Sequence, residues 1–169
     1  MDSMLLLHLM SELCPNQVRA IYIDHQLQSQ SASWGEFVAV QCQQRNIPCS
    51  VQAVAVETGN LENQARQARY DAYLQHLAPN EILVLAHHQQ DQAETLMLRL
   101  LSGAGIHGSA AMQAVDVREE MTIWRPLLDV SREQICQWAH QLNVKNIEDP
   151  TNLDTHYDRA WCREILWPL

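Results

Sequence analysis

The stretch that decides the fold is Ile82-Leu83-Val84-Leu85-Ala86-His87-His88-Gln89-Gln90-Asp91-Gln92-Ala93-Glu94-Thr95. Its first five residues form a short apolar run, which is typical of a buried strand. From Asp91 onward apolar residues recur at helical spacing, and Asp91, Glu94 and Thr95 share one face at i, i+3 and i+4. We therefore expect two carboxylates to point from the first turn of a helix into the crevice beyond the carboxyl end of the strand, where open α/β sheets bind ligands.

This pair of carboxylates has two interpretations. The functional one is a site for a ligand ammonium group or a magnesium ion. The structural one is that acidic residues stand in a first helical turn because the helix dipole favours negative charge there. The stretch by itself leaves both open.

The remaining sequence alternates helical and strand patterns, with no internal repeat and no low-complexity linker. Such alternation predicts a parallel sheet with right-handed crossovers. Helices are predicted over residues 5–13, 31–45, 60–77, 91–101, 131–142 and 158–166, and strands over residues 18–23, 49–56, 82–86 and 122–124. Ser31 or Ser33 is the expected N-cap of the second helix. Ser131 and Gln134 are expected to form a capping box at the fifth.

The composition fits one domain over residues 1–169, since a chain of this length with 47% hydrophobic residues can bury a core. The sequence has no apolar run long enough to span a bilayer and no basic-then-apolar signal segment. We therefore expect a cytoplasmic protein that does not bind membranes. The five cysteines are widely spaced and include no Cys-x-x-Cys pair, which argues against a disulfide framework.

The charge balance disfavours strong binding of nucleic acid by this chain. Eleven Lys and Arg residues stand against 20 Asp and Glu residues, giving a net charge of −9. Such a surface repels a polyanion at long range.

Several segments occur in an order that resembles one enzyme family. Residues 82–95 resemble the signature of the tRNA(Ile)-lysidine synthetases, a branch of the PP-loop (N-type) ATP pyrophosphatases. The other segments that resemble this family are residues 24–27, 60–70, 98–108, 125–128 and 149–154. The resemblance covers essentially all 169 residues. It implies a three-layer α/β domain with a parallel sheet, of the Rossmann-like type known as adenine nucleotide alpha hydrolase-like.

The chain departs from the family at its nucleotide-binding loop. The family reads Ser-Gly-Gly-x-Asp-Ser after a first strand, whereas this chain begins Met1-Asp2-Ser3. Glycines there let backbone amides approach a phosphate. We expect a truncated catalytic domain with a weakened ATP site, without the family's further tRNA-binding domains. Either the chain starts at an internal methionine or upstream residues are missing. A sheet that lacks a central strand would expose apolar surface and strand edges, so the chain is predicted either to pair with a second copy or to be poorly soluble.

The activity implied by the resemblance is ATP-dependent ligation of free L-lysine to C2 of the wobble cytidine, position 34, of an isoleucine tRNA with the anticodon CAU. ATP, with Mg²⁺ on its phosphates, adenylates the C2 oxygen and releases pyrophosphate. The amine of lysine then attacks C2 and expels AMP. The alternatives are another PP-loop enzyme that modifies tRNA or transfers an amide, and a fragment without catalytic activity.

The resemblance also implies which residues handle lysine. Asp91, Glu94 and Arg66 are the expected catalytic residues, and Asp91, Glu94 and His88 are expected to bind lysine. Arg66 is expected to neutralise negative charge on the phosphates or the RNA. For Arg66 the alternative is an ordinary surface ion pair with Glu62.

The expected nucleotide-binding residues are Asp2, Ser3, Asp24 and Ala86. Asp2 is in addition the expected ligand of the magnesium ion. All four follow from the resemblance and not from their spacing.

Overall fold

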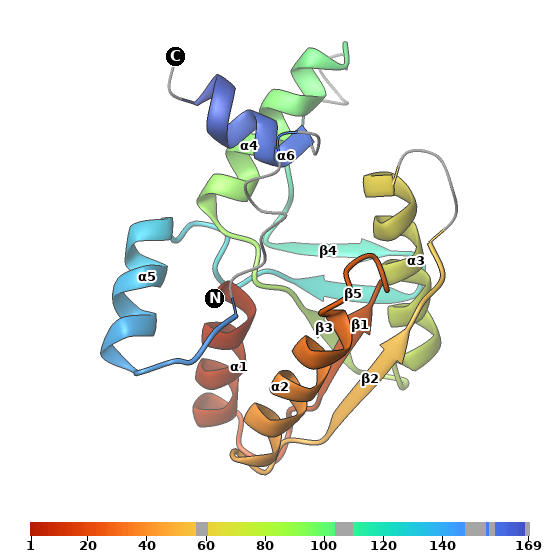
Figure 1. Cartoon of the computed structure of the whole chain (residues 1–169), viewed down its shortest axis with the longest axis vertical. Coiled ribbons are helices and arrows are strands. Elements are labelled where there is room, and N and C mark those ends of the chain that lie inside the picture. Colours follow the sequence, from red (N-terminus) through yellow and green to blue (C-terminus); the bar gives the residue numbers. More distant parts are fainter. Residues whose placement is uncertain (57–60, 104–109, 148–154, 156–157, 168–169) are drawn as a thin grey trace. The chain divides into compact units, whose positions relative to one another are not determined.

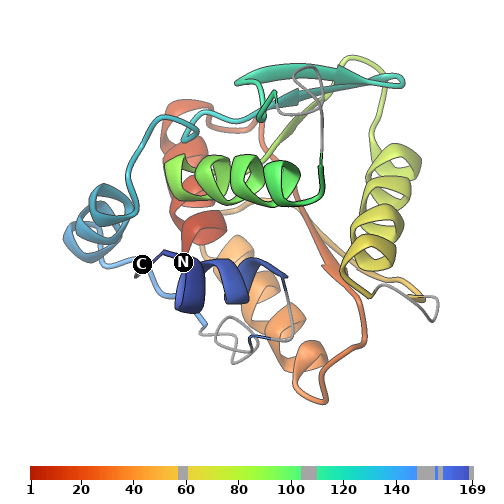
Figure 2. The same cartoon turned by 90° about the horizontal axis from the view of Figure 1, so that it is seen from above.

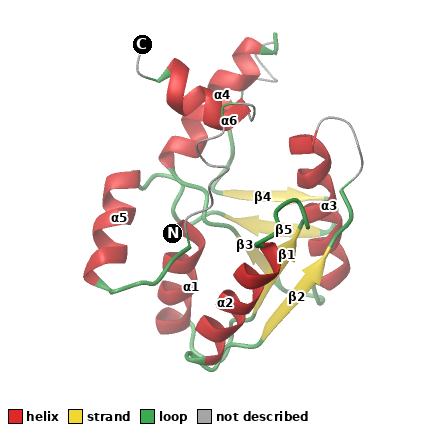
Figure 3. Cartoon of the chain, in the orientation of Figure 1, coloured by secondary structure: helices red, strands yellow, loops and turns green. Residues whose placement is uncertain are grey.

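The computed structural model of the chain describes residues 1–56, 61–103, 110–147, 155 and 158–167 (Figure 1). In chain order the elements are α1 (Asp2–Leu13), β1 (Ala20–Asp24), α2 (Ser31–Gln43), β2 (Cys49–Ala53), α3 (Leu61–His76), β3 (Ile82–Val84), α4 (Gln89–Leu101), β4 (Val115–Arg118), β5 (Met121–Trp124), α5 (Arg132–Gln141), α6 (Asp158–Trp161) and the π-helix η2 (Cys162–Leu166). Figure 3 shows this alternation of helices and strands. Among the described residues, no helix combines the length and the hydrophobicity needed to cross a bilayer.

The chain divides into two compact units. The N-terminal unit consists of Leu6–Glu81. The C-terminal unit consists of Met1–Leu5 and Ile82–Leu169.

In the N-terminal unit, β1 and β2 pair in parallel, with Ala20 opposite Cys49 and Asp24 opposite Ala53. Helix α2 lies close to both strands at Gly35. A Cβ atom at this position would meet Val51 at 3.3 Å and Tyr22 at 3.4 Å. A side chain at residue 35 would require Val51 or Tyr22 to move by a few tenths of an ångström, so glycine favours the close approach of helix and sheet.

The amino end of α2 differs from its prediction. The N-cap is Gln30, and it makes no side-chain capping bond. The Ser33 hydroxyl instead donates to the Gln30 carbonyl at 2.7 Å. The expectation that Ser31 or Ser33 caps this helix is therefore wrong, because the serines lie inside the first turn.

In the C-terminal unit, three strands form a sheet in the order β3-β5-β4. β3 pairs with β5 in parallel, as the alternation of strands and helices predicts. β4 was not predicted, and it pairs with β5 antiparallel. Only Glu119 and Glu120 separate these two strands, and Glu119 has φ 56°. A two-residue turn of this kind joins antiparallel strands.

The core of the C-terminal unit lies on one face of this sheet. Leu83 and Ile123 are neighbours in register, and they are 7% and 0% exposed. Ile82 and Trp124, on the opposite face, are 54% and 38% exposed. The sheet thus alternates between a buried and an exposed face.

Two predicted helices of this unit are confirmed. Ser131 caps α5 as expected: its hydroxyl accepts from the Gln134 amide at 3.2 Å, and the Gln134 side chain accepts from the Ser131 amide at 3.1 Å. The last predicted helix begins at Asp158 but continues from Cys162 as a π-helix. Figures 1 and 2 both show α6 beside α4, which places the end of the described chain next to the signature helix.

Candidate active site at the amino end of helix α4

Helix α4 begins with a reciprocal cap made by a histidine and an aspartate. His88, the N-cap, has an extended backbone, and its Nδ1 accepts from the Gln90 amide at 3.2 Å. In return, Asp91 Oδ2 accepts from the His88 amide at 3.0 Å. The helix therefore starts at Gln89, two residues earlier than predicted, and Asp91 stands at its third position. The cap holds the Asp91 carboxylate at the helix end.

The His88 ring connects two of the predicted sites. It is 3% exposed, and because Nδ1 accepts a hydrogen bond, the proton of the neutral ring is assigned to Nε2. Nε2 lies 3.5 Å from Asp91 Oδ2 and 3.8 Å from Asp2 Oδ2. The residue expected at magnesium and one residue expected at lysine thus face the same imidazole.

The two carboxylate oxygens of Asp2 have different surroundings. Arg132 Nη1 lies 3.4 Å from its Oδ2. Its Oδ1 is buried and receives no hydrogen bond from any described residue. A buried acceptor without a partner is costly in a folded protein, and it is the kind of atom that a bound cation satisfies.

Glu94 lies one turn beyond Asp91 and is 1% exposed. Arg163 Nη1 donates to its two oxygens at 3.2 and 3.4 Å. Burial raises the pKa of Glu94 above its usual range, the nearby Asp91 raises it further, and Arg163 and Arg159 oppose the shift. Loss of water therefore outweighs the two arginines at this carboxylate.

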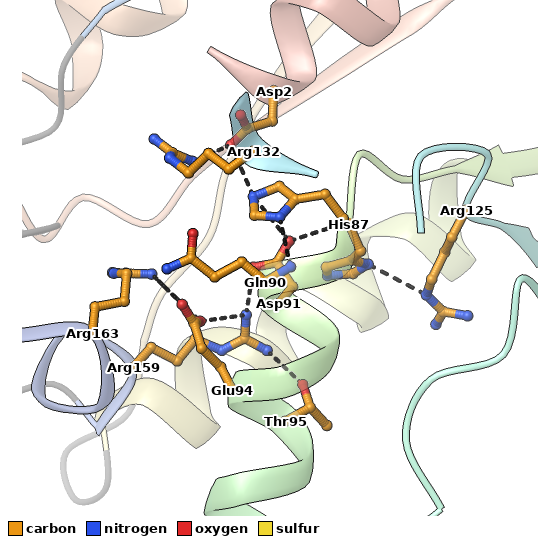
Figure 4. A network of polar contacts seen from close by, with 11 residues as sticks. Asp2, His87, Gln90, Asp91, Glu94, Thr95, Arg125, Arg132, Arg159 and Arg163 are labelled. Atoms are coloured by element: carbon orange, nitrogen blue, oxygen red, sulfur yellow. Dashed lines mark hydrogen bonds and ion pairs between the residues drawn. The ribbon is translucent and has the colours of Figure 1, made fainter. Parts of the chain in front are cut away.

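Arg159 joins the three side chains that the sequence places on one helix face (Figure 4). Its Nη1 donates to Asp91 Oδ1 at 3.2 Å and lies 3.9 Å from Glu94 Oε2. Its Nη2 lies 3.5 Å from Thr95 Oγ1. The predicted arrangement of these three residues is confirmed, and the face is turned toward α6.

A buried arginine, Arg125, lies near the end of β3. Arg125 is 3% exposed, and its Nε donates to His87 Nδ1 at 3.3 Å. Its Nη1 donates to the Gln113 carbonyl at 2.8 Å, and its Nη2 lies 3.8 Å from Asp116 Oδ2. Arg125 therefore ties the loop after β3 to the segment that enters β4.

Comparison with known proteins identifies the family. The family model of the PP-loop domain matches residues 1–169. The chain belongs to the PP-loop family. Membership of this family implies the use of ATP.

The PP-loop chain is similar to three curated proteins that carry the name tRNA(Ile)-lysidine synthase. That from Acinetobacter baylyi is 62% identical over 169 residues, which cover 100% of this chain and 37% of the relative. That from Haemophilus ducreyi is 44% identical and that from Pseudomonas fluorescens 37% identical, covering 99% and 100% of this chain and 39% of each relative. The chain thus spans about two fifths of the length of these relatives.

A solved PP-loop structure confirms the fold. The U34-tRNA thiolase NcsA from Methanococcus maripaludis, solved with its [4Fe-4S] cluster, matches with a TM-score of 0.68 and 12% identity, covering 95% of this chain and 66% of that one. At this identity the likeness concerns the α/β fold alone. The sequence resemblance to the lysidine synthetases is confirmed by the relatives and not by this structure.

The C-terminal unit of the PP-loop domain brings together four of the predicted site residues, namely Asp2, His88, Asp91 and Glu94. Ser3 is exposed beside Asp2, and Ala86 is half-buried shortly after β3. Part of the segment 98–108 and all of the segment 149–154 lie outside the described residues.

Two predicted site residues belong to the N-terminal unit. Asp24 is 8% exposed at the end of β1, where its Oδ1 accepts from the Gln26 amide at 2.8 Å. The Arg66 guanidinium lies over the Tyr70 ring, 5.0 Å from its centre. Their participation in one site with Asp91 stays a prediction.

Arg159 and Arg163 were not assigned to the site from the sequence. Their spacing of four residues on a short helix was the available signal, because it places two positive charges on one face. Their partners lie 64 to 69 residues earlier in the chain, and no local pattern connects the two segments.

Proposed function

We propose that the chain is the catalytic PP-loop domain, over residues 1–169, of a tRNA(Ile)-lysidine synthase. The reaction would join free L-lysine to C2 of cytidine 34 in an isoleucine tRNA with the anticodon CAU. The 62% identity to a relative of that name over the whole chain supports the proposal. The observation that carries it is one network of charged side chains, in which His88 lies between Asp2 and Asp91, and Arg159 links Asp91 to Glu94.

The proposed reaction has two steps. The C2 carbonyl oxygen of cytidine attacks the α-phosphate of ATP, and pyrophosphate leaves. A neutral lysine amine then forms a bond to C2, and the bond from C2 to the activated oxygen breaks to release AMP. The attacking amine loses one proton, which a carboxylate accepts.

The surroundings of the four residues support the roles that the family resemblance implies for them. Asp91 and Glu94 would hold the ammonium charge of lysine. The raised pKa of Glu94 favours its acceptance of the proton that the attacking amine loses. His88 would hold Asp91 in place through the cap.

Asp2 would hold magnesium together with the phosphates of ATP. Magnesium is usually bound by one or two carboxylates and substrate phosphates. The buried Asp2 Oδ1, which accepts no hydrogen bond from any described residue, fits this role. The described residues contain no group of three or more His, Cys, Asp or Glu side chains arranged for a metal ion, and the ATP phosphates and water would supply the other magnesium ligands.

The proposal includes the cytoplasm as the place of action, where tRNA is available, and a second copy of the chain as a partner. An exposed edge supports the latter: Val115 and Val117 on the edge strand β4 are 56% and 69% exposed. Light scattering tests it, and a monomer at all concentrations would contradict it.

The first prediction tests the assigned chemistry. Asp91→Asn is expected to lower transfer of labelled lysine to tRNA by about 100-fold or more, because it removes the charge that faces the substrate ammonium group. The matched control is Glu120→Gln, at an exposed turn in the same unit. Lysine incorporation at the wild-type rate by Asp91→Asn would remove this assignment.

The nucleotide half of the proposal is tested by calorimetry with magnesium-ATP. The chain is compared with a version in which Ser-Gly-Gly and a preceding strand are placed before Met1. We expect tighter binding in the second version, because the added amides contact phosphate. Absence of binding in both would contradict ATP use at this site.

A further inference from the structure

The two carboxylates expected to bind a ligand cation already hold cations of the chain itself. Asp91 and Glu94 supply two negative charges, and Arg159 and Arg163 supply two positive charges within 3.2 to 3.9 Å. The cluster is therefore electrically balanced without a ligand. A further ammonium group would make the site positive in a half-buried environment, which is unfavourable.

The two arginines are held differently. Arg163 places one nitrogen against both oxygens of Glu94, a carboxylate that is 1% exposed. Arg159 reaches Asp91, Glu94 and Thr95 at 3.2, 3.9 and 3.5 Å, and of these three contacts the one with Asp91 is the shortest. Arg159 is the arginine that can leave at the smaller cost, because Glu94 then keeps Arg163.

The element that carries these arginines is short. Helix α6 has four residues and the π-helix η2 has five. The buried side chains Ala160 and Cys162, at 1% and 0% exposure, anchor it. Trp161, Ile165 and Trp167 are 36% to 48% exposed. An element with few buried apolar side chains opens at a small free-energy cost, and π-helical turns are frequent at functional sites.

We propose that α6 and η2 form a latch in which the Arg159 guanidinium occupies the place of a ligand ammonium group on Asp91 and Glu94. A ligand with an aliphatic ammonium group binds by displacing Arg159, while Arg163 stays on Glu94. With lysine as this ligand the inference rests on the proposed function. Binding of lysine would then loosen the helix at the end of the described chain.

Competition of this kind lowers the apparent affinity for the ligand. Only the fraction of molecules with Arg159 displaced can bind, so the measured dissociation constant is the intrinsic one divided by that fraction. Removal of Arg159 should therefore tighten cation binding, whereas removal of a residue that contacts the ligand should weaken it. The sign of the change distinguishes a latch from a ligand-binding arginine.

The test is calorimetric titration of the wild type and of Arg159→Gln with L-lysine and, separately, with n-butylammonium chloride. We expect Arg159→Gln to bind both about tenfold more tightly, the order of magnitude of one hydrogen bond to a charged group. The matched control is Lys145→Gln, which removes one positive charge from an exposed position of the same unit. Unchanged or weaker binding by Arg159→Gln would overturn the latch, and so would an equal gain in Lys145→Gln.

Hydrogen exchange of the wild type supplies the second readout. Lysine is expected to increase exchange at the amides of α6 and η2, and norleucine, which lacks the side-chain ammonium group, is not. Increased protection by lysine would overturn the latch.

The outcomes separate the latch from the proposed function. If n-butylammonium binds Arg159→Gln more tightly but no lysine is transferred to tRNA by the wild type, the latch stands and the function fails. If lysine is transferred but Arg159→Gln binds neither probe more tightly, the function stands and the latch is overturned.

Discussion

Two arginine–glutamate pairs of this molecule have similar chemistry but opposite surroundings. In the N-terminal unit, Arg19 Nε donates to Glu81 Oε1 at 2.7 Å, and the side chains are 35% and 33% exposed. In the C-terminal unit, Arg163 donates to both oxygens of Glu94, which is 1% exposed.

The pKa values of the two glutamates move in opposite directions. The hydrogen bond from Arg19 and the amide of Ala78 lower the pKa of Glu81 to about 2. Burial raises the pKa of Glu94 although two arginines oppose it. At the surface the partner decides, and in the interior the loss of water decides.

The comparison indicates what each pair is for. The Arg19–Glu81 pair connects the start of β1 to the segment before β3, and both of its charges are balanced within the pair. In the cluster of Asp91, Glu94, Arg159 and Arg163, burial disfavours the negative charge of the Glu94 carboxylate. Such perturbed groups concentrate at functional sites.

The largest effect on stability is expected from Arg163→Met, which leaves Glu94 buried without its main partner. We expect a loss of about 3–5 kcal/mol in the free energy of unfolding at pH 7, measured by urea denaturation. The loss should shrink as the pH falls, because protonation of Glu94 removes the uncompensated charge. A loss below about 1 kcal/mol would show that Glu94 is not buried in solution.

A smaller effect is expected from Glu94→Gln, about 1–2 kcal/mol at pH 7, because the neutral amide keeps the shape but leaves Arg163 with a weaker acceptor. The pH dependence has a definite sign. A folded-state pKa above the unfolded value means that the contribution of Glu94 to stability falls as the pH rises from the unfolded pKa through the folded one.

The Glu94→Gln variant should therefore lack the fall in stability that the wild type shows as the pH rises. Urea denaturation of the wild type and of the variant between pH 4 and pH 8 checks this. Parallel pH profiles for the wild type and the variant would contradict a raised pKa of Glu94.

The smallest effect is expected from Glu81→Gln, no more than about 1 kcal/mol at pH 7, because solvent screens this half-exposed pair. The folded-state pKa of Glu81 is depressed, so its contribution is present above the usual value of 4.5 and is lost as the pH falls toward 2. Urea denaturation at pH 7, 4 and 2.5 measures this loss. Glu120→Gln at the exposed turn is the control, and equal acid profiles of the two variants would refute the prediction.

The sequence predicted most elements of the fold from local patterns. The alternation of apolar runs with helical spacing was sufficient for β1, β2, β3 and β5 and for the helices between them. It missed β4, a four-residue strand defined by its pairing with β5. It also misplaced the cap of α2 and the first residue of α4, because caps depend on which hydrogen bonds form and not only on residue type.

By itself, the sequence determined that Asp91, Glu94 and Thr95 share a helix face, since that follows from 3.6 residues per turn. Its motifs also determined the family. Only the tertiary structure decided what that face meets. Arg159 and Arg163 contact it from 64 to 69 residues further along the chain, and Asp2 contacts His88 from the amino-terminal end of the chain. Local spacing carries no information on such contacts, because they arise when distant segments pack together and exclude water from the charges between them.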